Sequence, residues 1–239
     1  QKQRAGKVTV GTLLVLASPD LAEVTAHLGF DWIWLDWQHG EWTELSLKNA
    51  LARFLCTDTA PLVRVKGVDP GAINHMLDMG AMGVIVPMVQ SAEQARAAAN
   101  AVFYPPRGQR SGGGNRLALI AGSDSADYYA GANEEMMLVV QVESEEAVAN
   151  VRGIMRVPGV SVVLIGPGDL MIDVKAHGHD EAHHQRLVQE VLRASKETGV
   201  AAGYFCETLQ EAERRVSQGF RFVNCGSDRK ILEDALRDW

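Results

Sequence analysis

Two acidic side chains follow apolar runs of the sequence and could hold a metal ion together. Glu143 comes directly after the run 136–142, and Asp169 comes shortly after the run 161–166. Mg²⁺ is typically bound by one or two carboxylates, with water and substrate oxygens completing its octahedron. Each acid could instead be a solvated residue at a strand end, and Asp169 could cap a helix. Gln141 lies on the same face of its predicted strand as Glu143, which favours a built site.

A buried cation and a titratable base follow two earlier runs. Arg64 lies within the otherwise apolar segment 61–66. A guanidinium buried there needs an anionic partner. That partner could be a carboxylate of the protein, or a substrate carboxylate or enolate oxygen, where a fixed donor contributes most. His39 follows the run 31–37 and is the only one of the 7 histidines in such a position. Because imidazole titrates near neutral pH, His39 beside Asp36 could act as a general base.

Two further groups of residues carry weaker signals. Four histidines gather in one short stretch, and they are His177, His179, His183 and His184. Their irregular spacing among polar residues favours a solvated face over a metal site. The segment Gly166-Pro167-Gly168 permits close approach of the backbone to a ligand, although ordinary turns have the same composition.

All these residues fall on a repeating pattern of strands and helices. Eight apolar runs predict strands over 8–16, 31–37, 61–66, 83–89, 136–142, 161–166, 200–206 and 221–225. Eight segments with helical periodicity follow them, over 20–29, 43–56, 70–80, 91–103, 145–156, 181–198, 208–218 and 229–238. This alternation is typical of a parallel sheet wound with helices. At 239 residues, the leading form is an α/β fold with one (β/α)8 (TIM) barrel domain over 1–239. An open doubly wound sheet is the alternative, but no GxGxxG motif follows the first predicted strand.

In such a barrel, chemistry takes place at the C-terminal ends of the strands, where the polar residues above are expected to meet. Ser18 and Thr208 are placed to cap helices, and Gly199 and Gly219 are placed to end them. The longest irregular stretch is 105–133. A loop of that length is usually a functional lid or contains a short helix.

The composition excludes several classes of protein. With 46% hydrophobic and 22% charged residues, the chain is globular rather than disordered. Its net charge of −7 argues against a nucleic-acid partner, which binds a basic patch. Cys56, Cys206 and Cys225 have no CxxC spacing and indicate neither a disulfide framework nor a zinc site. No apolar run could span a membrane, and the first residues lack a signal-peptide core, so we expect a cytoplasmic protein.

Several short motifs occur in a characteristic order. They are Asp36-Trp37-Gln38-His39, Pro61 to Val65, Leu77-Asp78-Met79-Gly80-Ala81, Val86-Pro87-Met88-Val89, Tyr104-Pro105-Pro106-Arg107-Gly108, Val140-Gln141-Val142-Glu143-Ser144 and Ile165-Gly166-Pro167-Gly168-Asp169-Leu170. In this order they resemble the HpcH/HpaI aldolase family of metal-dependent pyruvate aldolases, and the resemblance covers nearly all of residues 7–230. It implies a (β/α)8 barrel and a hexamer built as a trimer of dimers. It also implies a C-terminal helix exchanged between subunits.

The resemblance implies a divalent metal cation, Mg²⁺, Mn²⁺ or Co²⁺, and no organic cofactor. Glu143 and Asp169 would hold this ion, and a 2-keto acid substrate would chelate it. Gln141, the backbone at Gly168 and Asp169 would contact that substrate. Arg64 would neutralise the enolate.

The resemblance also implies an acid–base group. His39 would be the acid and base, and Asp78 would raise its basicity. Asp78 precedes the fourth predicted strand, at the opposite end of its own barrel, so it could serve only the site of a neighbouring subunit. Without the resemblance, Asp78 reads as an acid at a helix end.

The chain departs from the family pattern around His39. Gln38 stands where the family usually has Glu, which removes one negative charge, so Gln38 could hold a metal-bound water but could not take a proton. Trp37 and Trp42 stand where smaller residues are common. They could narrow the acceptor pocket, or they could pack between helices. We therefore count Asp36, Gln38 and Trp37 as possible supporting residues.

Taken together, these residues predict a carbon–carbon lyase that cleaves or forms 4-hydroxy-2-keto acids through a pyruvate enolate, with an aldehyde as the second product or substrate. Lys66 offers the rival chemistry of a Schiff base, but no neighbouring pattern supports it. An oxaloacetate decarboxylase, or an enolate-condensing enzyme of the macrophomate synthase-like or citrate-forming kind, would use the same residues. A non-catalytic barrel that binds keto acids is the third possibility.

Overall fold

Eight parallel strands close into a barrel in a computed structural model of the chain, which describes residues 2–3, 5–113 and 115–239. The strands are β1 (Thr9–Leu14), β2 (Trp32–Asp36), β3 (Ala60–Arg64), β4 (Gly83–Val86), β5 (Met137–Val142), β6 (Val160–Ile165), β7 (Ala201–Cys206) and β8 (Phe222–Ser227). Each strand pairs with the next along the chain, and β1 pairs in parallel with β8. The predicted (β/α)8 barrel is thus confirmed, and the open sheet is excluded.

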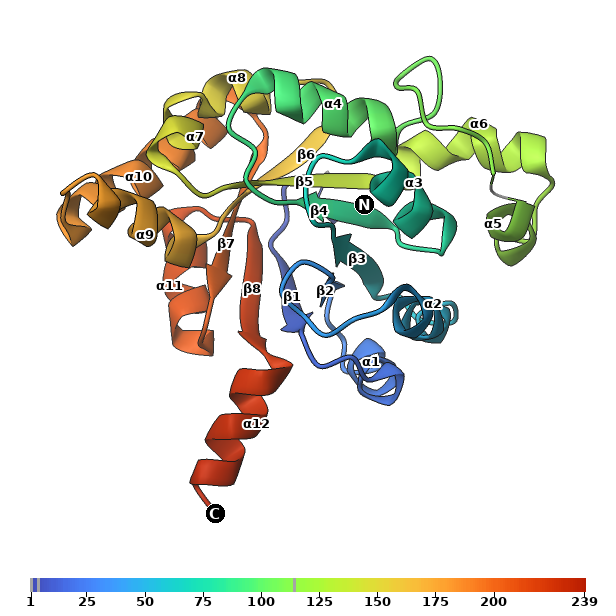
Figure 1. Ribbon diagram of the computed structural model, residues 1–239, viewed down its shortest axis with the longest axis horizontal. Helices are drawn as coiled ribbons and strands as arrows, with labels where there is room; N and C mark the ends of the chain where they lie inside the picture. Colours follow the sequence, from blue (N-terminus) through green and yellow to red (C-terminus); the bar gives the residue numbers. More distant parts are fainter. Residues whose placement is uncertain (1, 4, 114) are drawn as a thin grey trace.

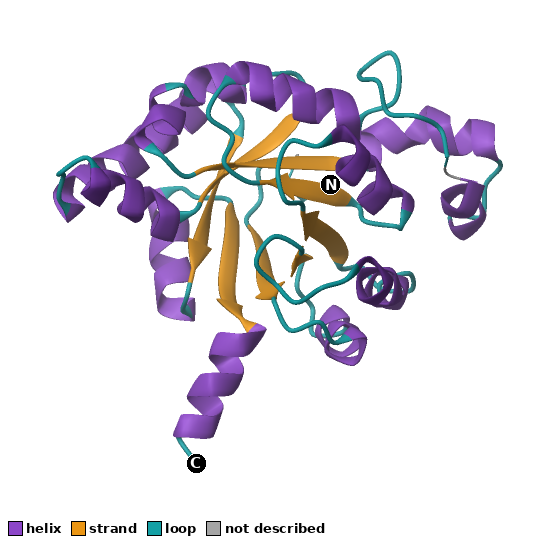
Figure 2. Cartoon of the chain, viewed as in Figure 1, coloured by secondary structure: helices purple, strands orange, loops and turns teal. Residues whose placement is uncertain are grey.

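Helices form the outer layer around these strands (Figures 1 and 2). They are α1 (Pro19–Ala26), α2 (Glu44–Arg53), α3 (Pro70–Asp78), α4 (Ala92–Val102), α5 (Asn115–Ile120), α6 (Ser125–Glu135), α7 (Glu145–Ala149), α8 (Val151–Met155), α9 (Pro167–Ala176), α10 (Glu181–Thr198), α11 (Leu209–Gln218) and α12 (Asp228–Arg237). The last of them, α12, extends away from the barrel instead of packing along it (Figure 1). None of the described helices is long and apolar enough to cross a membrane.

The predicted helix boundaries hold where side chains cap the ends. Ser18 accepts a hydrogen bond from the Leu21 amide at the start of α1, and Thr208 caps α11 in the same way. Gly199 and Gly219 end α10 and α11 in the left-handed conformation, with φ of 77° and 118°. Glycine adopts this conformation without the steric cost of a Cβ.

Two helical regions differ from the prediction, and a third agrees with it. The helix expected over 145–156 divides at Asn150, whose side chain donates to the Gln90 carbonyl at 2.8 Å. Helix α9 was missed because its first residues resemble a turn, yet Pro167 occupies the first helical turn, where its missing N–H costs nothing. The stretch 105–133 contains α5 and most of α6, so the expectation of a helix within it is confirmed.

Alternation along the strands fills the barrel interior in layers. Trp32, Trp34 and Leu62 belong to a separate buried cluster inside the barrel. Trp32 stacks on Phe222 with ring centroids 3.9 Å apart. Because strand side chains alternate between two faces, the next inward position on β2 after Trp34 is Asp36, at the C-terminal end. The barrel thus changes from apolar to polar at that end.

Gly11 on β1 leaves space for the interior layer that contains Trp32 and Phe222. A Cβ at Gly11 would lie 2.3 Å from the Trp32 ring, which cannot move aside because it stacks on Phe222. The absence of a side chain at Gly11 is therefore what permits a tryptophan inside the barrel.

We expect Gly11→Ala to overpack the interior and to lower the free energy of unfolding by about 1–3 kcal/mol. Thermal unfolding of the variant measures this. Gly131→Ala in α6 is the matched control, because nothing lies within 4 Å of its new Cβ. Equal melting temperatures for the two variants would contradict this account of the interior.

Candidate active site

A buried ion pair lies at the C-terminal ends of β2 and β3. Arg64 donates from Nε to Asp36 Oδ1 at 2.8 Å and from NH2 to Asp36 Oδ2 at 2.6 Å. Both residues are buried, and the guanidinium carbon lies 4.6 Å from the centre of the Trp34 ring. Of the two partners considered from the sequence, the structure shows the protein carboxylate. The third arm of the guanidinium remains directed toward β5.

That arm links the ion pair to the polar residues of β5. Arg64 NH1 lies 3.4 Å from Gln141 Oε1, and Gln141 Nε2 donates to Glu143 Oε1 at 3.0 Å. Gln141 and Glu143 are 1% and 3% exposed, so neither is a solvated strand-end residue. A chain of contacts from Asp36 to Glu143 therefore crosses the mouth of the barrel.

Met88 and Gly166 determine the position of the Glu143 carboxylate, one through a hydrogen bond and the other by leaving space. The Met88 amide donates to Glu143 Oε2 at 2.9 Å, from a backbone with φ of 54°. This left-handed conformation is uncommon outside glycine. A Cβ at Gly166 would lie 2.2 Å from Glu143 Oε1, so only glycine leaves space for the carboxylate. Both residues lie in segments that carry the family resemblance. The sequence indicates close approach to the backbone at Gly166, where the approaching group is the Glu143 carboxylate, but it carries no local signal for Met88.

The charge around Glu143 suits a divalent cation. Burial raises the pKa of Glu143 to about 7 against the lowering effect of the Met88 hydrogen bond, and the nearby charge of Asp169 adds to the rise. Arg64 lowers this pKa but is already paired with Asp36. Among the described residues, no lysine or arginine forms an ion pair with Glu143 or Asp169. Two such carboxylates form the oxygen donor set that Mg²⁺ or Mn²⁺ accepts. The residues present therefore fit the predicted metal ion.

The other predicted ligand lies in the first turn of α9. Gly166 is the N-cap residue of this helix, without a side-chain cap, and Asp169 lies in the first turn. The possibility that Asp169 caps the helix is therefore wrong. Gly168 and Asp169 are exposed, and the first N–H groups of a helix lack intrahelical partners. This end of α9 can accept an anionic group close to Asp169.

His39 lies in the turn that follows β2, with its side chain exposed. Asp36 Oδ1 accepts hydrogen bonds from the backbone amides of Gln38 and His39, at 3.1 and 3.2 Å. The carboxylate that fixes Arg64 thereby also fixes the turn that carries His39. Gln38 Oε1 is buried and has no hydrogen-bond partner among the described residues. It is an acceptor available to a water molecule.

The residues flanking this turn have different positions. Trp42 is buried in the core and donates from Nε1 to the Leu14 carbonyl at 2.9 Å, so it packs rather than lining an acceptor pocket. Trp37 is half-buried, and Lys66 Nζ lies 4.6 Å from the centre of its ring. Lys66 is exposed. It therefore lacks the apolar surroundings that activate a Schiff-base lysine.

Asp78 lies apart from this group, as its place before β4 predicts. It ends α3 and accepts a hydrogen bond from Arg110 NH2 at 2.6 Å, where the Arg110 side chain is fully buried. The Asp78 side chain is 30% exposed. Within this chain, its partner is Arg110 rather than His39.

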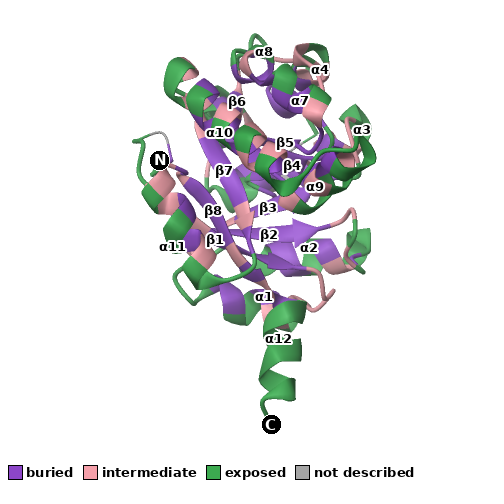
Figure 3. Ribbon diagram, turned by 90° about the vertical axis from the view of Figure 1, so that its left-hand side faces the viewer, coloured by how far each residue is buried: buried purple, intermediate pink, exposed green. Residues whose placement is uncertain are grey.

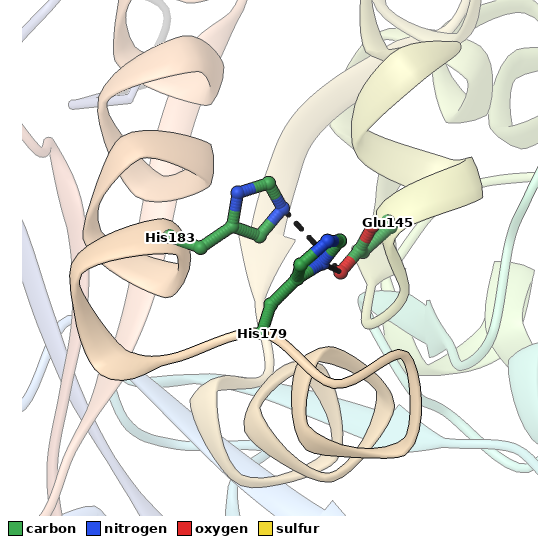
Figure 4. A group of neighbouring side chains, drawn as sticks. All are labelled: Glu145, His179 and His183. Atoms are coloured by element: carbon green, nitrogen blue, oxygen red, sulfur yellow. Dashed lines mark hydrogen bonds and ion pairs between the residues drawn. The ribbon is translucent and has the colours of Figure 1, made fainter.

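The histidine stretch does not form a uniformly solvated face. His177 and His179 are exposed, but His184 is buried against the barrel in α10, so the expectation is wrong for His184. Burial and the charge of Arg215 lower the pKa of His184. His179 and His183 both approach Glu145, at the start of α7 (Figure 4).

The closed barrel and the cluster of polar residues at the C-terminal ends of its strands define a (β/α)8-barrel enzyme. The family model of the HpcH/HpaI aldolase/citrate lyase family matches residues 10–235, and the chain belongs to this family. It is therefore a carbon–carbon lyase of the aldolase kind, as the motifs predict.

Named relatives and a solved structure agree with this assignment. The chain is 36% identical over 238 residues to the hydroxypyruvate/pyruvate aldolase of Chromohalobacter salexigens, covering 98% of this chain and 92% of that protein. It is 35% identical to the 4-hydroxy-2-oxo-heptane-1,7-dioate aldolase of Klebsiella pneumoniae, covering 96% of this chain and 87% of that protein. A crystal structure of a family member from Burkholderia cenocepacia has a TM-score of 0.92 at 29% identity, covering 100% of this chain and 95% of that one.

The raised pKa of Glu143 makes metal-free stability depend on pH. Because the pKa is about 7 in the folded protein against 4.5 for an ordinary Glu, the folded state holds this proton more tightly. Stability from the protonated carboxyl is complete below about pH 4.5 and is lost as pH rises to about 7, on the order of 3 kcal/mol in total. In chelator, Glu143→Gln should melt with a weaker pH dependence than the unmodified protein.

Thermal unfolding at about pH 5 and about pH 8 measures this difference. Glu146→Gln is the control, since it makes the same change at an exposed position. If Glu143→Gln and Glu146→Gln have the same pH dependence, burial of the Glu143 carboxyl does not have the stated effect.

Proposed function

We propose that this protein is a metal-dependent pyruvate aldolase, which cleaves 4-hydroxy-2-keto acids to pyruvate and an aldehyde and catalyses the reverse addition. The observation that carries this proposal is the buried Glu143 carboxylate, which Met88 and Gln141 hold at the barrel mouth within the electrostatic influence of Asp169. The aldolase names of the relatives support the same activity.

Glu143 and Asp169 would hold the divalent cation, with Mg²⁺, Mn²⁺ and Co²⁺ as candidates. The ion, when bound, supplies Lewis-acid stabilisation of the negative charge that develops on the keto oxygen. The unpaired acceptor Gln38 Oε1 would receive a hydrogen bond from a water of that ion. Gln38 carries no charge, and it would orient this water without taking its proton.

The start of α9 and Gln141 would orient the 2-keto acid. The first turn of α9, where Gly168 and Asp169 are exposed residues, suits the substrate carboxylate, because the helix N-terminus carries partial positive charge. Gln141 lies between Arg64 and Glu143 and would contact the keto acid from the barrel side.

His39 and Arg64 would carry the proton and the charge. His39 removes the proton from the C4 hydroxyl, the C3–C4 bond breaks, and its electron pair moves into the enolate of pyruvate. The aldehyde leaves, and a proton delivered to C3 completes pyruvate. Arg64, fixed by Asp36, stabilises the enolate oxygen with a donor that needs no reorganisation. Asp36, Gln38 and Trp37 support this arrangement.

The proposal includes a homo-oligomer, a hexamer arranged as a trimer of dimers, in which α12 is exchanged between subunits. Beyond its first residue, helix α12 is exposed along its length (Figure 3). Ile231, Leu232 and Leu236 are at least half exposed, and Trp239 is fully exposed. Leu232 and Leu236 lie four residues apart on one side of α12, and Trp239 follows the end of the helix; we call these three residues the apolar stripe. A second copy of this chain would cover that stripe and would place Asp78 beside the His39 of a neighbouring subunit.

We further propose that the domain extends over 1–239 and that the protein is cytoplasmic. The three cysteines are free thiols, and Cys56 is exposed, as suits a reducing compartment. Oxaloacetate decarboxylation and enolate condensation use the same residues but are not favoured by the named relatives, which are aldolases. The same names disfavour a non-catalytic barrel.

Pyruvate release after metal removal tests the aldolase proposal. The protein is stripped with chelator, Mg²⁺, Mn²⁺ or Co²⁺ is restored, and a panel of 4-hydroxy-2-keto acids is supplied beside oxaloacetate. We expect activity only with metal, and a loss of at least about a hundredfold in Glu143→Gln, since this variant lacks the ligand charge. Full activity in chelator would contradict the metal mechanism, and preferred turnover of oxaloacetate would favour the decarboxylase.

Mass measurement in solution tests the role of α12. Leu232→Glu with Leu236→Glu places charges on the apolar stripe, and we expect the hexamer to give way to smaller species. Glu233→Gln on the same helix is the control. A doubly substituted protein that still assembles as the unmodified one would exclude α12 from the interface.

A further inference from the structure

Three potential metal ligands meet on the outside of the barrel, on segments distinct from those that carry the proposed active-site residues. Glu145 begins α7, His179 lies between α9 and α10, and His183 lies in the first turn of α10. One ligand atom from each lies within 4.8 Å of the other two. Figure 4 shows the two imidazoles and the carboxylate directed toward one point.

Both imidazoles approach the same carboxylate oxygen. His179 Nδ1 lies 2.7 Å from Glu145 Oε1, and His183 Nε2 lies 3.4 Å from that oxygen. His183 Nε2 is buried and has no hydrogen-bond partner in the described part of the chain, although it points into the cluster. Its distance to Glu145 is longer than a well-formed hydrogen bond. The nitrogen is thus aimed at the shared oxygen without being satisfied by it.

The donor set selects a class of metal. Two imidazole nitrogens and one carboxylate oxygen suit Zn²⁺ and related transition ions, whereas Mg²⁺ prefers oxygen ligands throughout. Ligand atoms around a tetrahedral Zn²⁺ lie roughly 3.3 Å apart. The distances from Glu145 Oε1 to His179 Nδ1 and to His183 Nε2, 2.7 and 3.4 Å, are close to this spacing. The His179 side chain is 44% exposed, so an ion can enter from solvent and a water can complete its coordination.

We propose that Glu145, His179 and His183 form a second metal site, selective for Zn²⁺-type ions and separate from the Glu143–Asp169 pair. The ion would join the start of α7 to the connection between α9 and α10. The start of α7 already contacts α9 as well, because the Glu145 amide donates to Asp173 Oδ2 at 2.8 Å. Metal bound here would stabilise the contact between these segments, close to the two elements that carry Glu143 and Asp169.

One contact opposes the metal in the present arrangement. Arg186 NH2 donates to His183 Nδ1 at 3.1 Å, which places the imidazole proton on Nε2. Coordination through Nε2 requires that proton on Nδ1, so Arg186 must turn away when the ion binds. Arg186 is exposed and free to do so. Replacing it with Gln removes a positive charge and supplies an acceptor for the Nδ1 proton.

Zn²⁺ binding to the full chain, measured by equilibrium dialysis with Mg²⁺ in large excess, tests the site. Glu143→Gln is used as a second background so that uptake by the active site is removed. In both proteins we expect one Zn²⁺ per chain that Mg²⁺ does not displace. His179→Ala and His183→Ala should each weaken its binding by more than about tenfold, because each removes an inner ligand. Arg186→Gln should tighten it several-fold.

His177→Ala is the matched control, since this exposed histidine lies in the same segment but outside the cluster. Its Zn²⁺ affinity should equal that of the unmodified protein. Unchanged Zn²⁺ binding in His179→Ala and His183→Ala would overturn the proposal, as would uptake that disappears entirely with Glu143→Gln. Weaker binding in Arg186→Gln would contradict coordination through His183 Nε2. None of these outcomes depends on aldolase activity, which pyruvate release measures separately.

Discussion

The ion pair between Asp36 and Arg64 is the constraint on which the barrel mouth depends. A guanidinium at this depth is tolerated only with a hydrogen-bonded anion, and removing one partner of such a pair typically costs about 3–5 kcal/mol. Asp36 meets that need through two hydrogen bonds and also accepts the amides of Gln38 and His39. One carboxylate thereby holds a cationic donor and the turn that carries the proposed base. The stacked arrangement of Arg64 over Trp34 joins this polar layer to the apolar interior beneath it.

Because Arg64 is paired with Asp36, Glu143 has no ion-pair partner among the described residues. Burial and the charge of Asp169 then raise its pKa to about 7. The protein nevertheless keeps this carboxylate in place with the Met88 amide and the space at Gly166. This arrangement is unfavourable for an isolated carboxylate and favourable for a carboxylate that binds a divalent cation. The buried negative charge of Glu143, which no ion pair compensates in the described part of the chain, accounts for the pH dependence of the metal-free protein. It also accounts for the metal requirement of the proposed reaction.

Glu143 and Glu145 are only two positions apart in the sequence, yet their side chains lie in different parts of the barrel. Glu143 continues the inward alternation of β5, whereas Glu145 begins α7 and lies among the histidines outside. Glu143 therefore lies near other oxygen ligands at the mouth of the barrel, whereas Glu145 lies near two imidazoles on its outside. The separation favours different metal classes for the two places, because ligand type rather than affinity alone discriminates between divalent ions.

The sequence by itself determined the strand–helix alternation, the barrel and the residues of its polar layer, because strand periodicity and helix capping are local properties that short segments express. Motif order determined the family, since residues far apart in the chain must be retained together. Only the tertiary structure decided that Arg64 pairs with Asp36, that Trp42 is a core residue, and that Met88 and Gly166 hold Glu143. It also decided that His179 and His183 face Glu145. These contacts join residues tens of positions apart, and their geometry is set by the closure of the barrel and by which helix packs beside which strand, so no local pattern in the chain encodes them.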